Sequence, residues 1–281
     1  MARKIAAIVM ILLAAALFAA GGKDDSSASP GMEMTPSDPR LFQPGKLTVA
    51  TGEPVYPPWM LDDNPAGGEG FENGLVYALA EELGFAREDV IWVRQTFDQG
   101  IAPGAKPYDF NIQQYSVKEE RREFVDFSMV YYKPEKALVA LSDSKVSNAT
   151  SFADLRKLRW GATIGTVDLD YIETILGVEN PAVYNDQSAT FQAMLANQID
   201  ATLIGLPTAL YVTAVQVPEA SIAAILPHDP NDLGHGLVFE KGNPLVPWIN
   251  KGLEAIISKG IIADLTAKYL IGDDTIPEIS R

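Results

Sequence analysis

Residues 107–132, with the sequence PYDFNIQQYSVKEERREFVDFSMVYY, combine a short strand pattern, a polar strand end and an arginine in one unit. Apolar and polar residues alternate along residues 109–116, which predicts a strand. The strand period places three residues on one side, two of them hydrogen-bond donors: Ile112, Gln114 and Ser116. Arg121 follows in a predicted helical turn, and the planar fork of an arginine can grip a ligand carboxylate with two hydrogen bonds. The stretch therefore predicts a carboxylate receptor built on Arg121, whereas we expect Arg122 to be a solvent-exposed charge.

On both sides of this stretch, segments with strand patterns alternate with segments of helical period. Strands are predicted at residues 46–51, 90–94, 137–141, 160–164, 199–204 and 236–239. Helices are predicted at residues 74–85, 152–155, 170–176 and 189–196, from residue 206 onward, and at 246–260 and 261–270. Such alternation is typical of mixed α/β sheets with crossover helices. The chain after residue 40 is long enough for one large domain or two modest ones.

The N-terminus has the pattern of an export signal. Arg3 and Lys4 precede an apolar run at residues 5–20, and small residues close it, which predicts a signal peptide at residues 1–22. The run is shorter than the ~20 residues of a membrane-spanning helix, so we expect export rather than a retained anchor. The segment resembles a lipoprotein processing box in which Ala20 stands in place of the lipid-bearing cysteine. Either a cysteine has been replaced there, or an ordinary signal peptidase cleaves near Gly21.

Composition narrows the function classes that the chain can belong to. Residues 23–40 are rich in Ser, Pro, Asp and Gly without an apolar period, which predicts a disordered tether. The chain has no cysteine and only two histidines, His228 and His235, so neither a thiolate nor a histidine metal site is expected. The formal net charge is -15, and the basic residues near Arg121 are interleaved with glutamates, which argues against binding of nucleic acid.

Five segments together resemble the solute-binding proteins of ABC importers for polar amino acids, which have the type II periplasmic-binding fold. They are KLTVATGEPVYPPW at residues 46–59, GFENGLVYALAEELGF at 70–85, YSVKEERREFVDFSMVYY at 115–132, ADLRKLRWGATIGT at 153–166 and FQAMLANQIDATLIG at 191–205. The resemblance covers nearly all of the chain after the tether. It implies two α/β lobes, each a mixed sheet flanked by helices, joined by two crossover hinge strands, with the ligand in the cleft between them.

The resemblance also implies roles for individual residues. Arg121 and Ser116 would bind the ligand carboxylate, and Thr166 would add donors from the opposite lobe. Gln114 stands where family members often have a small residue or a serine. Tyr56 would form an aromatic wall, and Glu53 occupies an acidic position near the amine or side chain of the ligand.

The chain departs from the family pattern at Gly205. The family usually has an aspartate there, which binds the α-ammonium group of the ligand. A buried ammonium group without an anion would cost several kcal/mol. Either Glu53, Asp168 or Asp170 supplies the negative charge from another direction, or the ligand lacks a standard α-amino group.

Several of these residues also have ordinary structural interpretations. Trp59 and Phe97 are as compatible with core or hinge packing as with ligand contact. Glu53 could be a solvated loop carboxylate. We expect His235 to be a residue of the hinge region rather than a catalytic base.

The resemblance implies lobe 1 at residues 41–134 and 238–281, lobe 2 at residues 135–237, and a monomer without a cofactor. It implies a receptor in the periplasm, or on the outer face of the cytoplasmic membrane, that passes an amino acid or related small carboxylate to an ABC permease. A cyclohexadienyl-dehydratase-like enzyme on the same fold, with Glu53 as acid or base, is the alternative. The sensor lobe of a signalling receptor is a third possibility, which lacks support because no transmembrane segment follows in the sequence.

Overall fold

The structure of the chain, a computed structural model, describes residues 34–270 and 276–279. The predicted signal peptide at residues 1–22, Ala20 and most of the predicted tether at residues 23–40 lie outside the described residues. None of the helices formed by the described residues combines the length and the apolar character needed to cross a bilayer.

The end of the predicted tether, residues 34–40, packs against the fold. The Gly45 amide donates a hydrogen bond to the Pro36 carbonyl at 2.7 Å. Met34 contacts the largest apolar cluster of the protein. The expectation of a disordered segment up to residue 40 therefore does not hold for these residues, because their backbone and apolar side chains have partners in the folded unit.

Ten strands are found among the described residues. They are β1 (Leu47–Gly52), β2 (Val90–Gln95), β3 (Phe110–Asn111), β4 (Val125–Tyr132), β5 (Lys136–Leu141), β6 (Gly161–Thr163), β7 (Ala182–Tyr184), β8 (Ala201–Gly205), β9 (Ala220–Leu226) and β10 (His235–Glu240). Sheet 1 has the order β2-β1-β3-β10-β4, sheet 2 the order β8-β5-β9, and sheet 3 consists of β6 and β7.

Sheet 1 is mixed, as the alternation of strands and helices predicted. β1 is parallel to β2 and β3, while β10 is antiparallel to β3 and β4. In sheet 2, β5 is antiparallel to both of its neighbours, and sheet 3 is a parallel pair. A single bridge between Trp160 and Ala201 joins sheet 3 to the start of β8.

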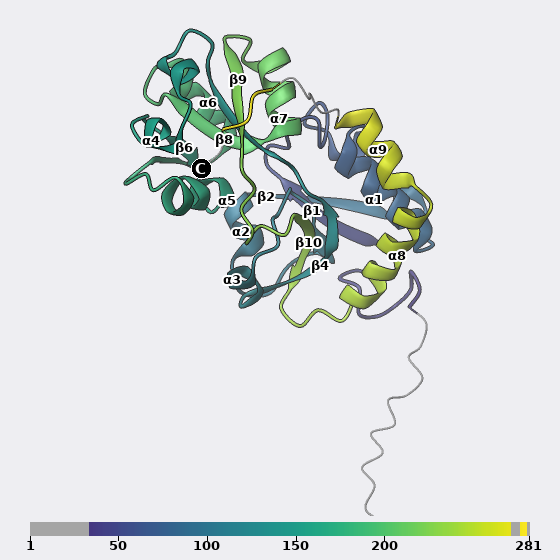
Figure 1. Ribbon diagram of the computed structural model, residues 1–281. Coiled ribbons are helices and arrows are strands. Elements are labelled where there is room, and N and C mark those ends of the chain that lie inside the picture. Colours follow the sequence, from purple (N-terminus) through teal and green to yellow (C-terminus); the bar gives the residue numbers. More distant parts are fainter. Residues whose placement is uncertain (1–33, 271–275, 280–281) are drawn as a thin grey trace, which may run out of the picture. The chain divides into compact units, whose positions relative to one another are not determined.

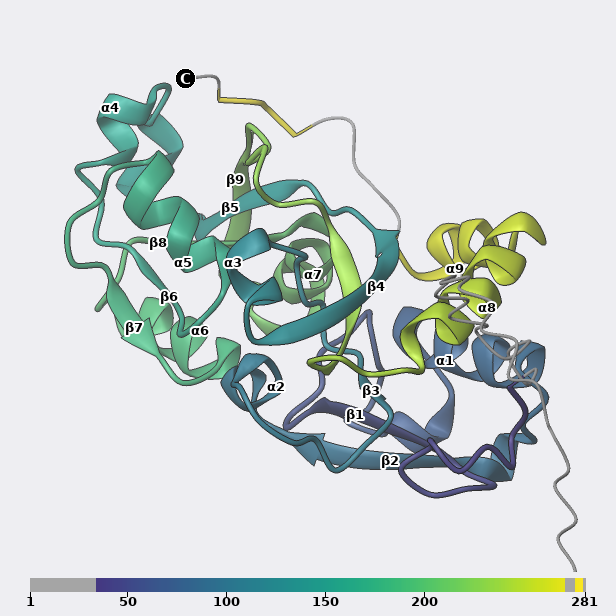
Figure 2. The same ribbon diagram turned by 90° about the horizontal axis from the view of Figure 1, so that it is seen from below.

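The described helices are α1 (Phe71–Glu82), α2 (Phe97–Ile101), α3 (Glu119–Arg122), α4 (Phe152–Leu155), α5 (Val167–Asp170), α6 (Gln187–Leu195), α7 (Leu206–Tyr211), α8 (Val246–Ser258) and α9 (Ile261–Tyr269). Figures 1 and 2 show α1, α8 and α9 side by side next to sheet 1, and α7 beside sheet 2. Residues 171–175 continue α5 as a wider π-helical turn.

The contact between α1 and α8 depends on a glycine. Leu79 on α1 and Leu253 on α8 are fully buried. A Cβ atom at Gly252 would lie 2.6 Å from Cδ1 of Leu79, closer than carbon atoms can approach. The missing side chain therefore lets α8 pack directly on the apolar face of α1.

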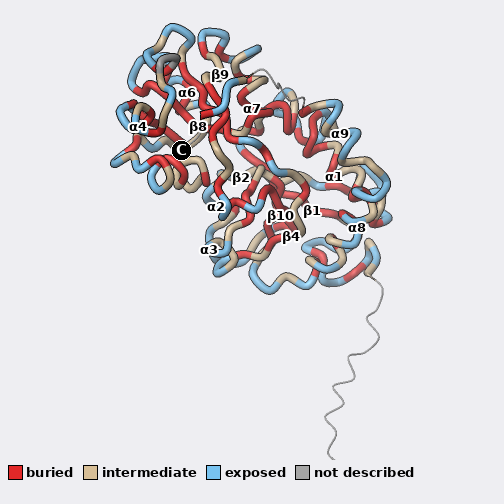
Figure 3. Tube along the Cα trace, viewed as in Figure 1, coloured by how far each residue is buried: buried red, intermediate tan, exposed pale blue. Residues whose placement is uncertain are grey.

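Sheet 1 forms one group and sheets 2 and 3 form another, and each group has its own apolar core. The largest cluster lies between sheet 1 and helices α1 and α8 and contains Trp59. Two further clusters surround sheets 2 and 3, and Trp160 lies in one of them. Figure 3 shows that buried residues follow the strands while exposed ones lie on the outer turns. Separate cores allow the two groups of sheets to act as two bodies.

The strand predicted at residues 109–116 is wrong in its length. Strand β3 covers only Phe110–Asn111, and Gln114 adopts a positive φ of 52°. This left-handed residue breaks the strand alternation, so Ile112 enters the core of sheet 1 while Gln114 and Ser116 line a pocket. The three side chains predicted on one side therefore do not share a face.

Three strands, β4, β7 and β9, have no counterpart in the predicted pattern. Strand β9 reads ASIAAIL, and its apolar residues do not alternate, so a periodicity argument does not separate it from a loop or a buried helix segment. Strand β7 has three residues, too few for any period to register. The pairing of these strands with their neighbours in the sheets, rather than a local pattern in the sequence, identifies them.

Two connections link the strands of sheet 1 to those of sheet 2. The chain passes from β4 to β5 through residues 133–135, and it returns from β9 to β10 through residues 227–234. Residues 276–279 then lie against β9, where the Ile279 amide donates to the Ile225 carbonyl at 3.0 Å. The predicted range 238–281 assigns residues 276–279 to the lobe of sheet 1, whereas they lie against β9 of sheet 2. The mixed sheets, flanking helices and two main connections agree with the predicted α/β class.

Candidate functional site

A pocket of about 190 Å³ opens where the ends of β1 and β3 in sheet 1 face β5, β8 and the start of α5. The space suits a small molecule rather than a polymer. All eight residues proposed from the sequence line it: Glu53, Tyr56, Gln114, Ser116, Arg121, Thr166, Asp168 and Gly205. The structure thus brings together residues that lie up to 152 positions apart in the sequence.

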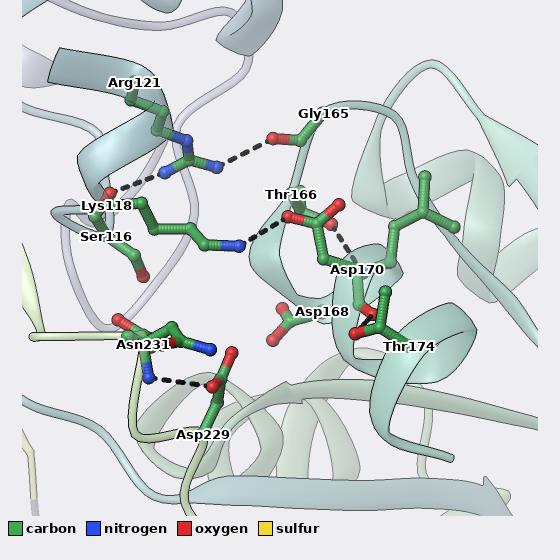
Figure 4. Close-up of polar contacts among 12 residues, drawn as sticks. Ser116, Lys118, Arg121, Gly165, Thr166, Asp168, Asp170, Thr174, Asp229 and Asn231 are labelled. Carbon is green, nitrogen blue, oxygen red and sulfur yellow. Dashed lines mark hydrogen bonds and ion pairs between the residues drawn. The ribbon is translucent and has the colours of Figure 1, made fainter. Parts of the chain in front are cut away.

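Arg121 on α3 connects the two sides of the pocket (Figure 4). Its Nη1 donates to the Ser116 carbonyl at 2.7 Å, and its Nη2 donates to the Gly165 carbonyl at 2.8 Å. Burial lowers the pKa of the Arg121 guanidinium, and the carboxylates of Asp170 and Asp232 oppose that shift. Since a guanidinium has five N–H donors, these two carbonyls leave others available for a ligand.

Ser116 and His235 form the floor of the pocket near Arg121. Ser116 is 2% exposed and pairs with His235 through an isolated antiparallel bridge. Burial lowers the pKa of His235 to about 3, so the imidazole is neutral. A neutral, buried imidazole at the start of β10 fits the predicted place near the connection between the sheets.

Gln114 faces a buried carboxyl group, that of Glu72, which the sequence interpretation did not identify. The backbone amide of Gln114 donates to Glu72 Oε1 at 3.0 Å. The side-chain amide of Gln114 and the hydroxyl group of Tyr131 also donate to this carboxyl group. Burial raises the pKa of Glu72 to about 7, although these hydrogen bonds oppose the shift. Glu72 lies in a helix of ordinary sequence, FENGLVYALAEE, so no local signal marks it.

Thr166 and Asp168 come from the start of α5, opposite Arg121. The Thr166 hydroxyl caps this helix by accepting from the Leu169 amide at 3.2 Å. Asp168 Oδ1 lies 2.8 Å from Nζ of Lys136, the first residue of β5. Lys136 also lies 3.1 Å from Asp232 Oδ2 and is 3% exposed. The sequence interpretation began this strand at residue 137 and so passed over Lys136.

Three remaining predicted residues form other parts of the wall. Glu53 is exposed at the rim, while Tyr56 is half-buried and burial raises the pKa of its hydroxyl group. Gly205 ends β8 and pairs in register with Lys136 across the ladder to β5. The basic residue Lys136 is therefore the strand neighbour of Gly205, the position at which this sequence lacks the aspartate of the family pattern.

Trp59 is 1% exposed in the core of sheet 1 and also lines the pocket, so its packing role is observed and its contact with a ligand stays a prediction. Its Nε1 donates to the Thr208 hydroxyl at 2.7 Å, which ties the loop after β1 to α7 beside sheet 2. Phe97 lines the pocket as well, and its ring packs on Tyr115 with centroids 4.5 Å apart.

Replacing Thr208 with valine is expected to lower the free energy of unfolding by about 1–3 kcal/mol, because a buried indole N–H loses its acceptor. Thr208→Ser keeps the hydroxyl group and is the matched control. Urea unfolding of the three proteins measures the difference. Equal stability of the valine and serine variants would show that the hydrogen bond does not contribute.

Comparison with known proteins places the chain among binding proteins. Residues 47–272 match the family of bacterial extracellular solute-binding proteins, family 3. A probable histidine-binding protein of Campylobacter jejuni is 26% identical over 208 residues, which cover 71% of this chain and 76% of that protein.

Solved structures agree with this assignment. An ancestral arginine-binding protein bound to arginine is 26% identical with a TM-score of 0.67, and the match covers 81% of this chain and 99% of the other. An ancestral amino acid-binding protein, described as a precursor of cyclohexadienyl dehydratase, has a TM-score of 0.67 at 24% identity, covering 81% and 96% of the two chains. The second similarity concerns the fold alone.

Proposed function

Because the chain belongs to family 3 of the bacterial extracellular solute-binding proteins, we propose that it is the receptor of an ABC importer that captures an amino acid. In this proposal residues 41–134 and 238–270 form one lobe and residues 135–237 the other. The lobes close on the ligand, and the closed form is what the permease in the membrane recognises. Closure is driven by the tighter binding of the ligand to the closed state.

The placement of Arg121 is the observation that carries the proposal. The guanidinium lies at the pocket wall and binds only carbonyl oxygens, one from each side of the pocket. Within the part of the chain that the structure describes, no carboxylate lies at ion-pair distance from it. A half-buried cation without an anionic partner favours a ligand carboxylate, which an arginine can hold with two hydrogen bonds.

Contacts across the pocket support closure as the mode of capture. Besides Arg121, the Lys118 ammonium group binds Asp170 Oδ2 at 2.9 Å, and Trp59 binds Thr208. Each contact joins a residue of the first proposed lobe to one of the second. Two of these contacts, those of Arg121 and Trp59, are made by residues that line the pocket in which the ligand would lie.

A basic amino acid is the first ligand to test. Two of the relatives are described as binding histidine and arginine. The pocket wall includes the acidic residues Glu53 and Asp186, and it carries aromatic rings such as Tyr56 that can stack on a planar cation. The net charge of -15 also favours the approach of a cation.

Export follows from the same proposal. The predicted signal peptide at residues 1–22 would direct the protein to the periplasm or to the outer face of the cytoplasmic membrane, where a segment near residues 23–33 would serve as a tether. A lipid anchor would require a cysteine at position 20, where this sequence has alanine.

The enzyme alternative with Glu53 as acid has less support. A carboxyl group that donates a proton near neutral pH is normally held in an apolar or like-charged environment. Glu53 is instead exposed at the pocket rim. We therefore propose binding without turnover, and incubation of the bound ligand with the protein, followed by chromatography, tests this by looking for a product.

A thermal-shift screen against the twenty L-amino acids tests the proposed function. A ligand at about 100 times its Kd stabilises the folded state by about 2.7 kcal/mol, which corresponds to a rise of roughly 5–10 °C in melting temperature for a protein of this size. We expect such a rise with at least one amino acid, with arginine and histidine tested first. No change with any of the twenty at 10 mM would rule the proposal out.

A further inference from the structure

Lys136 is a buried cation in the pocket wall, and its surroundings determine the charge that the pocket presents to a ligand. The Lys136 ammonium group lies 2.8 Å from Asp168 Oδ1 and 3.1 Å from Asp232 Oδ2. Gly205, its partner in the neighbouring strand, contributes no side chain. Two carboxylates around one ammonium group leave this cluster, the Lys136 triad, with a net charge of about -1 when both aspartates are ionised.

The two aspartates of the Lys136 triad differ in what they can still bind. Asp232 has a side chain that is 2% exposed, and its Oδ1 accepts a hydrogen bond from the Gly234 amide at 3.1 Å. The Asp168 side chain is 19% exposed and lines the pocket, and Lys136 binds only its Oδ1. Among the described residues Asp168 Oδ2 has no hydrogen bond, so this oxygen can accept one from a ligand. Figure 4 shows the Asp168 carboxylate on the side of α5 that faces Ser116.

The other acids near the pocket are less suited to bind a ligand cation close to Arg121. Asp170 is bound to Lys118 and does not line the pocket. Asp186 caps α6 by accepting from the Ala189 amide at 2.8 Å. Glu53 is exposed at the rim, where water weakens an ionic contact. Asp168 is a partly buried acid of the pocket wall that is held by a buried ammonium group, and among the described residues its Oδ2 accepts no hydrogen bond.

Arg121 and the Lys136 triad together form a pocket with two poles. Among the described residues no carboxylate lies at ion-pair distance from Arg121, which contributes a positive charge, and the triad contributes a net negative charge that reaches the pocket through Asp168. A zwitterion neutralises both poles. A carboxylate without an amine would neutralise Arg121 and leave the charge of the triad without a counter-charge in a partly buried site, which is costly.

We propose that the ligand is a zwitterionic α-amino acid whose ammonium group binds Asp168, and that Lys136 and Asp232 are positioning residues. Lys136 orients the Asp168 carboxylate, and Asp232 offsets the positive charge of Lys136, so that the triad as a whole keeps a net negative charge. This inference rests on the proposed function, because it assumes that the pocket binds a small carboxylate through Arg121. The acid that binds the ligand amine then lies at the start of α5, whereas the family pattern has this acid at the end of β8.

Pairs of ligands that differ only in the amine test the inference. Calorimetric titration gives the Kd for L-arginine and 5-guanidinopentanoic acid, and for L-histidine and 3-(imidazol-4-yl)propanoic acid. We call the ratio of the two Kd values in a pair the amine discrimination. For the wild-type protein we expect a ratio of about 100 or more, the usual scale for one buried charged hydrogen bond.

Three variants separate the roles of the acids. Asp168→Asn still pairs Lys136 with Asp232, so we expect it to fold and to lower the amine discrimination to about 10 or less. Asp232→Asn leaves Asp168 in place but cancels its charge against Lys136, and we expect a reduction of about tenfold although Asp232 does not touch the ligand. Glu53→Gln removes the acid that would contact the ligand side chain, so it should change the Kd of both members of a pair by the same factor and leave the amine discrimination at the wild-type value.

The possible failures are distinguishable. Unchanged discrimination in Asp168→Asn, or a collapse of discrimination in Glu53→Gln, overturns the inference while amino acid binding by the wild type still supports the proposed function. Equal wild-type affinity for both members of a pair also overturns it. If the wild type binds neither member of either pair at 10 mM, the proposed function itself fails for these ligands. Should Asp168→Asn not fold, unchanged discrimination in Asp232→Asn overturns the inference instead.

Discussion

Replacing Arg121 with alanine is expected to weaken the binding of an amino acid by about 100- to 1,000-fold, or about 3–4 kcal/mol. The change removes the charge and the fork that would bind the ligand carboxylate, and it leaves the ligand anion partly buried without a partner. It also removes the hydrogen bond between Arg121 and the Gly165 carbonyl, which joins the two sides of the pocket. Calorimetric titration of the variant with the best ligand from the thermal-shift screen measures the loss.

Two further variants show whether the loss of affinity is specific to Arg121 and whether it depends on the planar guanidinium group. Arg122→Ala removes the neighbouring arginine, whose side chain is 40% exposed and pairs with Glu119 at 3.2 Å, and we expect no change in affinity. Arg121→Lys keeps the charge but not the planar fork, so we expect an intermediate loss of about tenfold or more. An affinity that survives Arg121→Ala would mean that the carboxylate binds elsewhere and that the proposed geometry is wrong.

Glu72 is expected to make the protein less stable as the pH rises from about 5 to 8. Its pKa is raised from 4.5 to about 7 in the folded state by burial. Between these values the folded state holds the proton more tightly than the unfolded state, so the free energy of unfolding falls as the pH increases. A shift of this size corresponds to about 3 kcal/mol once the pH is well above 7. Asp109, whose pKa burial raises to about 6, acts in the same direction.

Urea unfolding at pH 5 and pH 8 tests this expectation with Glu72→Gln. The variant cannot titrate at this position, so its stability should depend less on pH than that of the wild type, by about 2–3 kcal/mol over this range. Glu81→Gln alters an exposed carboxylate on the same helix and should behave like the wild type. If the wild type and Glu72→Gln show the same dependence on pH, the Glu72 carboxyl group is not held protonated by the fold.

Much of the fold was accessible from local patterns in the sequence. The helices and strands with a clear period, such as α8 and β2, lie close to the predicted ranges. The predicted helix at 189–196 is followed by Asn197, which has a positive φ of 56°, and Pro207 lies in the first turn of α7, the helix predicted from residue 206 onward. These features depend on residues that are neighbours in the chain, which is the information that a single sequence contains.

The parts of the site that the sequence did not reveal depend on contacts between distant segments. Lys136 looks like an ordinary charge at the start of a strand, and its importance arises from Asp168 and Asp232, 32 and 96 positions away. Glu72 looks like an exposed residue in the first turn of a helix, but it is buried because Gln114 and Tyr131 cover it. Arg121 was predicted from its own stretch of sequence, the family resemblance added Ser116 as its partner, and the role of both residues in binding stays a prediction.

A crystal structure of the protein with its best amino acid ligand tests the central claim most directly. We predict that the ligand carboxylate accepts hydrogen bonds from the Arg121 guanidinium and from the Ser116 hydroxyl group, in the pocket lined by Thr166 and Asp168. A ligand bound in this pocket with its carboxylate directed away from Arg121, or bound outside the pocket, would contradict the account.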